Sequence, residues 1–234
     1  GRVGVRGGAG RWWGVGGGVP APGHAILVGR SIAATLPEAR GPGLALMVMD
    51  VCGAPALVAR LVREYSAKGG APSVLVLGGA GKSGSLSLAA AQDAGAGRQV
   101  AVVPDEREAR MLQDTGLADH VVITDARSPL GLSAAVEAAG GPADITVVCV
   151  DVPGCEQPAL LSTAQGGTVV FFSMATNFAA AALGAEGLAA DVRMLVGNGY
   201  VPGHADYALE LLRKNSAVRG LFEGRLDREQ TGTL

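Results

Sequence analysis

The chain has 234 residues with a formal net charge of −2, and 48% of its residues are hydrophobic. This length suits one large domain or a domain and a half with a sizeable core. The small charge argues against a nucleic-acid or membrane-surface partner. An aromatic content of only 4% also argues against binding single-stranded nucleic acid by stacking on its bases. No apolar run reaches the roughly 18 residues of a membrane helix. No secretory signal is evident, so we expect a cytoplasmic setting.

Three scattered cysteines occur, with no C-x-x-C pair, at positions Cys52, Cys149 and Cys155. An odd, unclustered set predicts neither a disulfide framework nor a structural zinc site. We therefore expect no metal.

The first part of the chain shows little periodicity. Residues 1–23 are glycine-rich and are interpreted as loop, and the apolar run 24–28 predicts a strand. Residues 35–43 are interpreted as a connection. Apolar residues then recur at helical spacing over 44–68, with Pro55 expected to break or restart that helix.

From residue 73 onward, short β-rich runs alternate with helical patterns. This alternation is typical of parallel strands joined by crossover helices. It predicts an α/β fold, a doubly wound, six-stranded parallel Rossmann sheet. The expected strands are 74–77, 100–103, 121–123, 145–150, 168–172 and 192–196, and the expected helices are 83–94, 105–115, 129–139, 155–164 and 178–190. The tail, 203–225, predicts one or two helices that pack outside the sheet.

A glycine cluster separates the first strand from its helix, with Gly78, Gly81 and Gly84 spaced as G-x-x-G-x-x-G. Such glycines make the turn, let the backbone approach a pyrophosphate and let the helix pack on the strand. The helix N-terminus, Lys82-Ser83, would offer unpaired N–H groups to phosphate. A P-loop is disfavoured because the glycine it requires is replaced by Val76. The alternative is a glycine turn that binds no ligand.

Further cofactor contacts are expected at the carboxyl ends of the strands. Asp105 lies 21 residues after Gly84, at the distance of an adenosine-ribose ligand, although it could equally cap the following helix. NAD is favoured, and Arg107 leaves NADP possible. Asp151, Ser173 and Met174 follow the fourth and fifth strands and complete the predicted set.

Three polar residues are the candidates for catalysis: Asp50, Glu186 and His204. Asp50 lies in the apolar stretch Met47-Val-Met-Asp-Val-Cys52, where a carboxylate is costly to bury unless it is paired. Glu186 and His204 have the alternative roles of a surface group and a helix cap.

The order of motifs resembles the nucleotide-binding half of the medium-chain dehydrogenase/reductase superfamily. Within it, the chain more narrowly resembles the diamino acid dehydrogenases of lysine fermentation. The stretches that carry it are Gly23 to Ser31, Asp50 to Pro55, Leu75 to Gly84, Phe171-Phe-Ser-Met-Ala-Thr176, Ala182 to Gly187 and Gly197-Asn-Gly-Tyr200 with His204.

The resemblance implies oxidative deamination of a small diamino acid, with hydride transfer to NAD and release of ammonia. It implies that residues 1–43 are the remnant and linker of an N-terminal catalytic domain, most of which is absent. Residues 44–68 then form a connecting helix, 69–200 the Rossmann domain and 201–234 C-terminal helices. By the same analogy, two chains would pair through the sixth strand as a homodimer.

Two departures and two alternatives remain open. With the catalytic domain mostly missing, the chain could bind dinucleotide and be inactive alone. Asp151 stands where an amide is expected. The alternatives are an NADPH-dependent quinone or enoyl reductase of the same superfamily and a non-catalytic dinucleotide-binding module.

Overall fold

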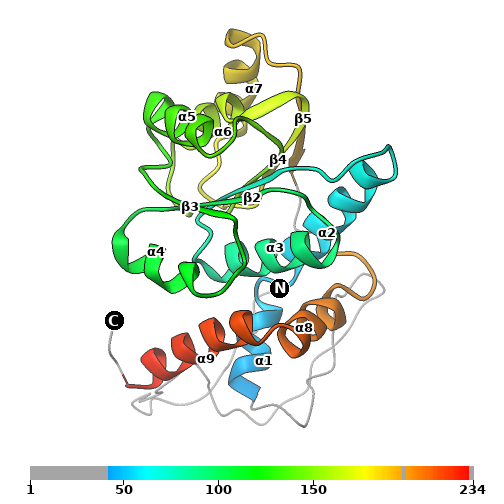
Figure 1. Ribbon diagram of the computed structural model, residues 1–234, viewed down its shortest axis with the longest axis vertical. Coiled ribbons are helices and arrows are strands. Elements are labelled where there is room, and N and C mark those ends of the chain that lie inside the picture. The colour runs from blue at the N-terminus through cyan, green and yellow to red at the C-terminus, as the bar shows by residue number, and fades with distance from the viewer. Residues whose placement is uncertain (1–41, 197–198, 232–234) are drawn as a thin grey trace, which may run out of the picture.

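The structure, a computed structural model, describes residues 42–196 and 199–231 (Figure 1). The strand predicted over 24–28, the loop 1–23 and nearly all of the connection 35–43 lie outside these residues, as does most of the expected remnant of a second domain.

A six-stranded parallel sheet forms the centre of the described chain, in the order β3-β2-β1-β4-β5-β6. The chain moves outward from β1 to β3, returns to β4 beside β1, and moves outward again to β6. This order confirms the predicted doubly wound sheet. The strands are β1 (Val74–Leu77), β2 (Gln99–Val103), β3 (His120–Ile123), β4 (Ala143–Val148), β5 (Thr163–Phe171) and β6 (Arg193–Val196).

Helices cover both faces of the sheet, as Figure 1 shows. Val74 and Val76 of β1 join a core on the face of α2, α3 and α4, whereas Leu75 and Leu77 join the core beneath α5, α6 and α7. Because successive side chains of a strand point to opposite faces, a strand covered on both must be apolar throughout. The helices are α1 (Pro42–Met49), α2 (Gly53–Ser66), α3 (Lys82–Asp93), α4 (Glu106–Gln113), α5 (Pro129–Ala138), α6 (Glu156–Leu161), α7 (Phe178–Gly187), α8 (His204–Lys214) and α9 (Ser216–Thr231).

The expected connecting helix is two helices, because the chain turns between Met49 and Gly53. Pro55 fits the expected restart of the helix. It lies in the first turn of α2, where a proline is tolerated because its missing N–H would have no partner. Asp50 therefore lies in an exposed turn, and the expectation that it stands within an apolar helix is wrong.

The helix predicted over 155–164 is also shorter than expected. It ends at Leu161, and β5 begins at Thr163. The Thr163 hydroxyl lies 2.7 Å from the Thr146 hydroxyl of β4 and 2.7 Å from the Ala159 carbonyl oxygen. These buried contacts fix the strand beside β4 before the apolar run begins.

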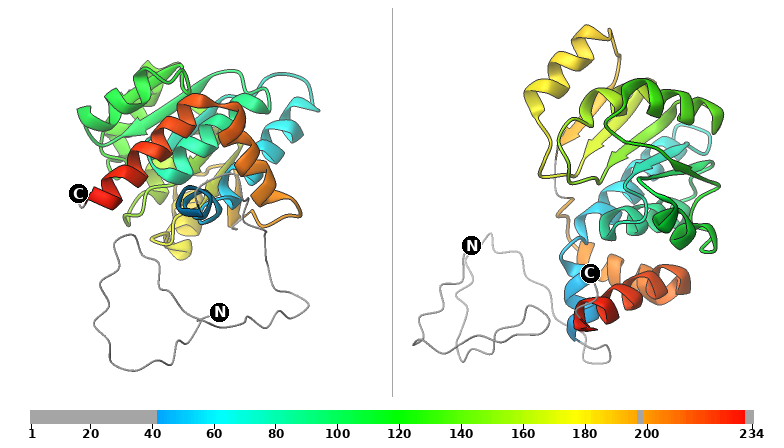
Figure 2. Two further views of the ribbon diagram at one scale, coloured as in Figure 1. Left: turned by 90° about the horizontal axis from the view of Figure 1, so that it is seen from below. Right: turned by 90° about the vertical axis from the view of Figure 1, so that its left-hand side faces the viewer.

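The C-terminal helices α8 and α9 lie outside the sheet, as expected, and pack with α1 at one end of the molecule (Figure 2). Buried Leu211, Leu212, Val218 and Phe222 join these helices to the core of α2 and α3. Tyr207 of α8 donates a 3.0 Å hydrogen bond to Asp93 of α3.

No single helix in the described part of the chain is long and apolar enough to cross a membrane. Among the helices described, α1 and α2 taken together, bent by 52°, meet the requirements of length and composition.

Candidate functional site

The glycine turn after β1 has the geometry that the spacing predicts. Gly78 has φ of +81°, a left-handed backbone conformation that L-residues with side chains rarely adopt. A Cβ on Gly84 would lie 2.0 Å from the Gly78 carbonyl oxygen, so only glycine lets α3 approach the strand this closely. The turn and the helix packing therefore both depend on glycine.

The first turn of α3 presents free backbone donors. No described group accepts a hydrogen bond from the N–H of Lys82, Ser83 or Gly84, whereas the Ser85 N–H already donates to the Gly81 carbonyl oxygen at 2.9 Å. Unpaired N–H groups and the positive end of the helix dipole together attract an anion.

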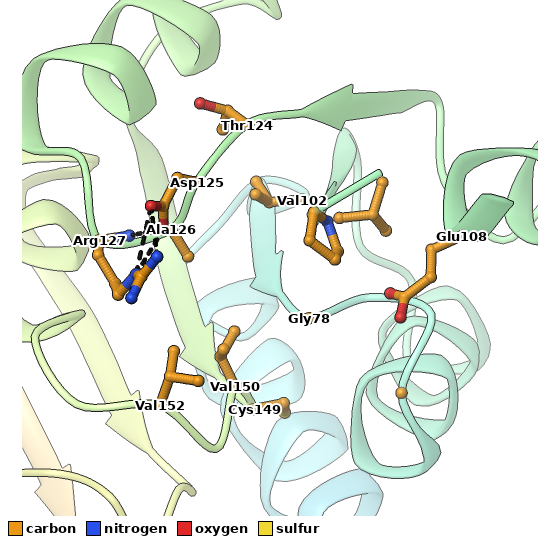
Figure 3. Close-up of a pocket in the computed structure, with 13 residues that line it drawn as sticks. Gly78, Val102, Glu108, Thr124, Asp125, Ala126, Arg127, Cys149, Val150 and Val152 are labelled. Atoms are coloured by element: carbon orange, nitrogen blue, oxygen red, sulfur yellow. Dashed lines mark hydrogen bonds and ion pairs between the residues drawn. The ribbon is translucent and has the colours of Figure 1, made fainter. Parts of the chain in front are cut away.

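A cavity of about 520 Å³ opens directly beside this turn. Gly78 and Gly81 line it, together with residues at the ends of β2 and β4 and in the segment that follows β3 (Figure 3). The apolar lining residues are Val102, Val103, Pro104, Ala126, Cys149, Val150 and Val152, and the polar ones are Glu108, Thr124, Asp125 and Arg127.

The residues present fit a dinucleotide. The cavity spans the strand ends next to the point where the sheet order reverses between β1 and β4, the position at which open α/β sheets bind ligands. The glycine cradle leaves room for a pyrophosphate against the α3 donors, and the adjoining apolar cavity is of a size that receives a small organic group. Gly78 and Gly81 line the cavity, and Lys82, Ser83 and Gly84 open the helix beside it, so the structure brings these five predicted residues together.

The Lys82 side chain points to a carboxylate. Its Nζ lies 2.9 Å from Oδ2 of Asp50, with Lys82 half-buried and Asp50 exposed. The pair joins the α1–α2 turn to the N-terminus of α3, so a predicted catalytic residue and a predicted phosphate ligand are direct partners. What Lys82 contributes from α3 itself is its free N–H.

Asp105 caps helix α4, since its Oδ1 accepts a 2.9 Å hydrogen bond from the Glu108 N–H. The capping interpretation is confirmed, and ribose binding stays a prediction. The side chain of Glu108, three residues after Asp105 and within α4, lines the cavity. Sequence spacing alone did not indicate Glu108.

The remaining predicted cofactor residues follow β4 and β5. Asp151 is exposed, and its neighbours Val150 and Val152 line the cavity. Ser173 accepts a 3.0 Å hydrogen bond from the Ala175 N–H, and Met174 is 96% exposed. Behind this loop, the buried Glu156 carboxylate accepts a 2.7 Å bond from the Asn177 N–H, which fixes the loop where it enters α7.

The three catalytic candidates do not form one cluster. Glu186 is exposed on α7, at the end of the molecule opposite to α8, which begins at His204 (Figure 1). The His204 ring lies 5.2 Å from that of Tyr200, and its Nδ1 is 2.6 Å from the Val201 carbonyl oxygen. Asp50 lies in the α1–α2 turn. The role of each stays a prediction.

Two arginines that the sequence did not single out lie at the site. Arg127 forms an ion pair with Asp125 at the cavity rim (Figure 3). Arg225 of α9 donates a hydrogen bond to the Ala80 carbonyl oxygen within the glycine turn, although 145 residues separate the two. A charge-pair pattern after a strand, D-x-R, was the available signal for Arg127; nothing local marked Arg225.

Among residues 42–196 and 199–231, no group of three His, Cys, Asp or Glu side chains has an arrangement that could hold a metal ion.

The sheet order, the glycine turn and the cavity define a fold of the Rossmann, dinucleotide-binding class. The chain is 43% identical over 205 residues to L-erythro-3,5-diaminohexanoate dehydrogenase of Acetoanaerobium sticklandii and 41% identical over 204 residues to that of Fusobacterium nucleatum. These alignments cover 86% of this chain but only 58% and 57% of the relatives. The resemblance expected from the motifs is therefore confirmed. The chain spans little more than half the length of these relatives.

Solved structures share the fold. An alcohol dehydrogenase from Thermotoga maritima superposes with a TM-score of 0.58 at 14% identity, over 83% of this chain and 56% of that one. The structure of AibC gives a TM-score of 0.57 at 22% identity, over 81% and 60%. No protein-family model matches the chain.

Proposed function

We propose that this chain forms the cofactor-binding part of an enzyme that oxidatively deaminates L-erythro-3,5-diaminohexanoate to 5-amino-3-oxohexanoate with NAD. The observation that carries the proposal is the 43% identity over 205 residues to a dehydrogenase of that name. The glycine cradle and the adjoining cavity supply a physical reason for a nicotinamide dinucleotide.

Bound NAD would supply the acceptor for the hydride from the amine-bearing carbon of the substrate. The chain's own part is to hold the diphosphate on the free N–H groups of Lys82, Ser83 and Gly84. Glu108 gives the cavity an acidic wall, which favours a ribose with free hydroxyls over one carrying a 2′-phosphate, and therefore NAD over NADP.

Deamination also requires a base, which takes the ammonium proton and activates the water that releases ammonia. Asp50 and His204 are the candidates that lie on the α1, α2 and α8 side of the molecule. The Asp50 carboxylate is 65% exposed, but it pairs with the Lys82 ammonium at 2.9 Å, so a substrate ammonium group would have to displace or share that partner.

The activity is tested by NADH absorbance with L-erythro-3,5-diaminohexanoate. The chain is assayed alone and joined to the part of the A. sticklandii enzyme that it does not match. We expect NADH formation that depends on the diamino acid in the joined protein. An absence of NADH from a folded, NAD-binding fusion would reject the named reaction.

Assays of the same fusion protein distinguish the two rival functions. A quinone or enoyl reductase would oxidise NADPH with a quinone or enoyl substrate, and a non-catalytic module would bind NADH without turnover. Calorimetric titration with NAD and NADP measures the cofactor preference directly. Homodimer formation and a cytoplasmic location remain part of the proposal.

A further inference from the structure

An ion pair lies at the cavity rim. Arg127 Nε lies 2.9 Å from Asp125 Oδ1, and Nη2 lies 2.9 Å from Oδ2. The Arg127 backbone N–H also donates to Oδ1 at 2.9 Å. Because both carboxylate oxygens accept from the same guanidinium, this two-point contact orients the plane of the guanidinium, and Figure 3 shows the pair at the cavity.

The pair is electrically balanced and open to a ligand. The side chains of Arg127 and Asp125 are 58% and 51% exposed. The Asp125 hydrogen bonds raise the pKa of Arg127, and Arg127 lowers the pKa of Asp125, so both groups stay ionised around neutral pH. Because its charge is already neutralised, Arg127 is a poor receptor for a phosphate, but its flat face can stack on an aromatic ring.

The rest of the cavity suits such a ring. Apolar side chains at the end of β2 and beyond β2 and β4 line it, among them Val102, Pro104 and Val152. The charged side chains of the lining are Glu108, Asp125 and Arg127, two carboxylates and one guanidinium, which leave a net charge of −1. An uncharged planar base fits this lining better than a second phosphate does.

We propose that Arg127, oriented by Asp125, stacks on the adenine base of the cofactor. This contact determines where the adenosine end of the cofactor binds. This rests on the proposed binding of NAD. Asp125 is a positioning residue: it orients the guanidinium and cancels the charge that would otherwise attract a 2′-phosphate.

The test is calorimetric titration of the full chain with ADP-ribose, which has the adenine, and with nicotinamide mononucleotide, which lacks it. Arg127→Ala should weaken ADP-ribose binding about three- to tenfold and leave the mononucleotide unchanged. Arg127→Lys keeps the charge but not the planar face, and it should weaken ADP-ribose as well. Arg110→Ala is the matched control, an exposed arginine of α4 that bonds to its own helix at Glu106.

Asp125→Asn gives a second measurement, the affinity for NADP relative to NAD, which would not change if Asp125 had only a structural role. Removal of the carboxylate leaves Arg127 unpaired, so the affinity for NADP relative to NAD should rise severalfold. Unchanged ADP-ribose binding in Arg127→Ala, or an equal loss of both ligands, would overturn the inference. So would a folded wild-type chain that binds no ADP-ribose. Failure of amine-dependent NADH formation, by contrast, rejects the proposed reaction and leaves the base contact standing.

Discussion

At the scale of single residues, burial decides what the cysteines can do. Cys149 lines the cavity, but protein atoms crowd its thiol, and this burial raises its pKa to about 12. Burial, then the neighbouring Glu156 carboxylate, raises the pKa of Cys155 to about 11. A thiol with such a pKa stays protonated at neutral pH and is a poor nucleophile.

This burial predicts a loss of stability at alkaline pH. In the unfolded chain a cysteine titrates near 9, whereas folded Cys149 keeps its proton up to about 12. Between those values the unfolded state alone releases the proton, so the free energy of unfolding falls as pH rises, by at most about 1.4 kcal/mol per pH unit for one group. Urea midpoints at pH 8, 9 and 10 should fall less steeply in Cys149→Ala than in wild type. Parallel slopes would contradict the assignment, whatever the variant's overall stability.

Asp105 has a structural role that can be separated from ribose binding. Asp105→Ala removes the cap of α4 and should cost about 1 kcal/mol of stability, whereas Asp105→Asn keeps a good capping group. If the carboxylate also binds ribose, Asp105→Asn should unfold like wild type yet bind NAD severalfold more weakly. Thermal melts and calorimetry check the two effects. Wild-type NAD affinity in Asp105→Asn would leave Asp105 with capping alone.

At the scale of secondary-structure elements, the site depends on how closely α3 approaches β1. The helix N-terminus reaches the strand end only because Gly84 has no side chain. On the other side, Arg225 ties α9 to the same turn through the Ala80 carbonyl oxygen. The glycine turn and the first N–H groups of α3, where we expect the phosphates, are therefore held by β1 on one side and by α9 on the other, two elements that are distant in sequence.

Gly84→Ala tests this approach. Its Cβ would overlap the Gly78 carbonyl oxygen at 2.0 Å, so the helix must move, at a cost of about 1–3 kcal/mol. NAD affinity should fall at least about tenfold, since the free N–H groups move with the helix. Gly220→Ala, in α9 with no atom within 4 Å of the added methyl, is the control and should be neutral or stabilising by up to about 1 kcal/mol. Equal behaviour of the two variants would exclude a special role for Gly84.

At the scale of the whole molecule, the sheet formed by the described residues ends at two edge strands, β3 and β6. Each ends on an exposed apolar residue, Ile123 at 42% and Val196 at 61%. An exposed strand edge offers unpaired backbone groups to a second chain. The expected homodimer uses β6, which would extend the sheet across two copies.

Light scattering tests the choice of edge. The wild-type chain should have about twice its 23.3 kDa mass. Val196→Glu should return it to the mass of a monomer, because the new carboxylate would lose its water where the two edges pair. Ile123→Glu makes the same change at the other edge and should leave the dimer intact. A wild-type monomer, or dissociation by Ile123→Glu instead, would contradict pairing through β6.

Much of the fold could be predicted from local pattern. The strand 74–77 was predicted with the bounds of β1, and the other five strands were found within a few residues, except that β5 begins at Thr163 and not at 168. A buried parallel strand must be apolar on both faces and is bounded by glycine turns, so its signal is local. The same holds for Gly78, Gly81 and Gly84, whose spacing follows from a tight turn between β1 and α3.

The sequence by itself therefore determined the alternation of strands and helices, the glycine turn and the position of the phosphate cradle, because each depends on neighbouring residues. Only the tertiary structure decided which distant side chains meet there. It paired Asp50 with Lys82, placed Arg127 and Glu108 on the cavity and brought Arg225 to the glycine turn across 145 residues. Such contacts follow from the order in which strands pack, and no local periodicity records that order.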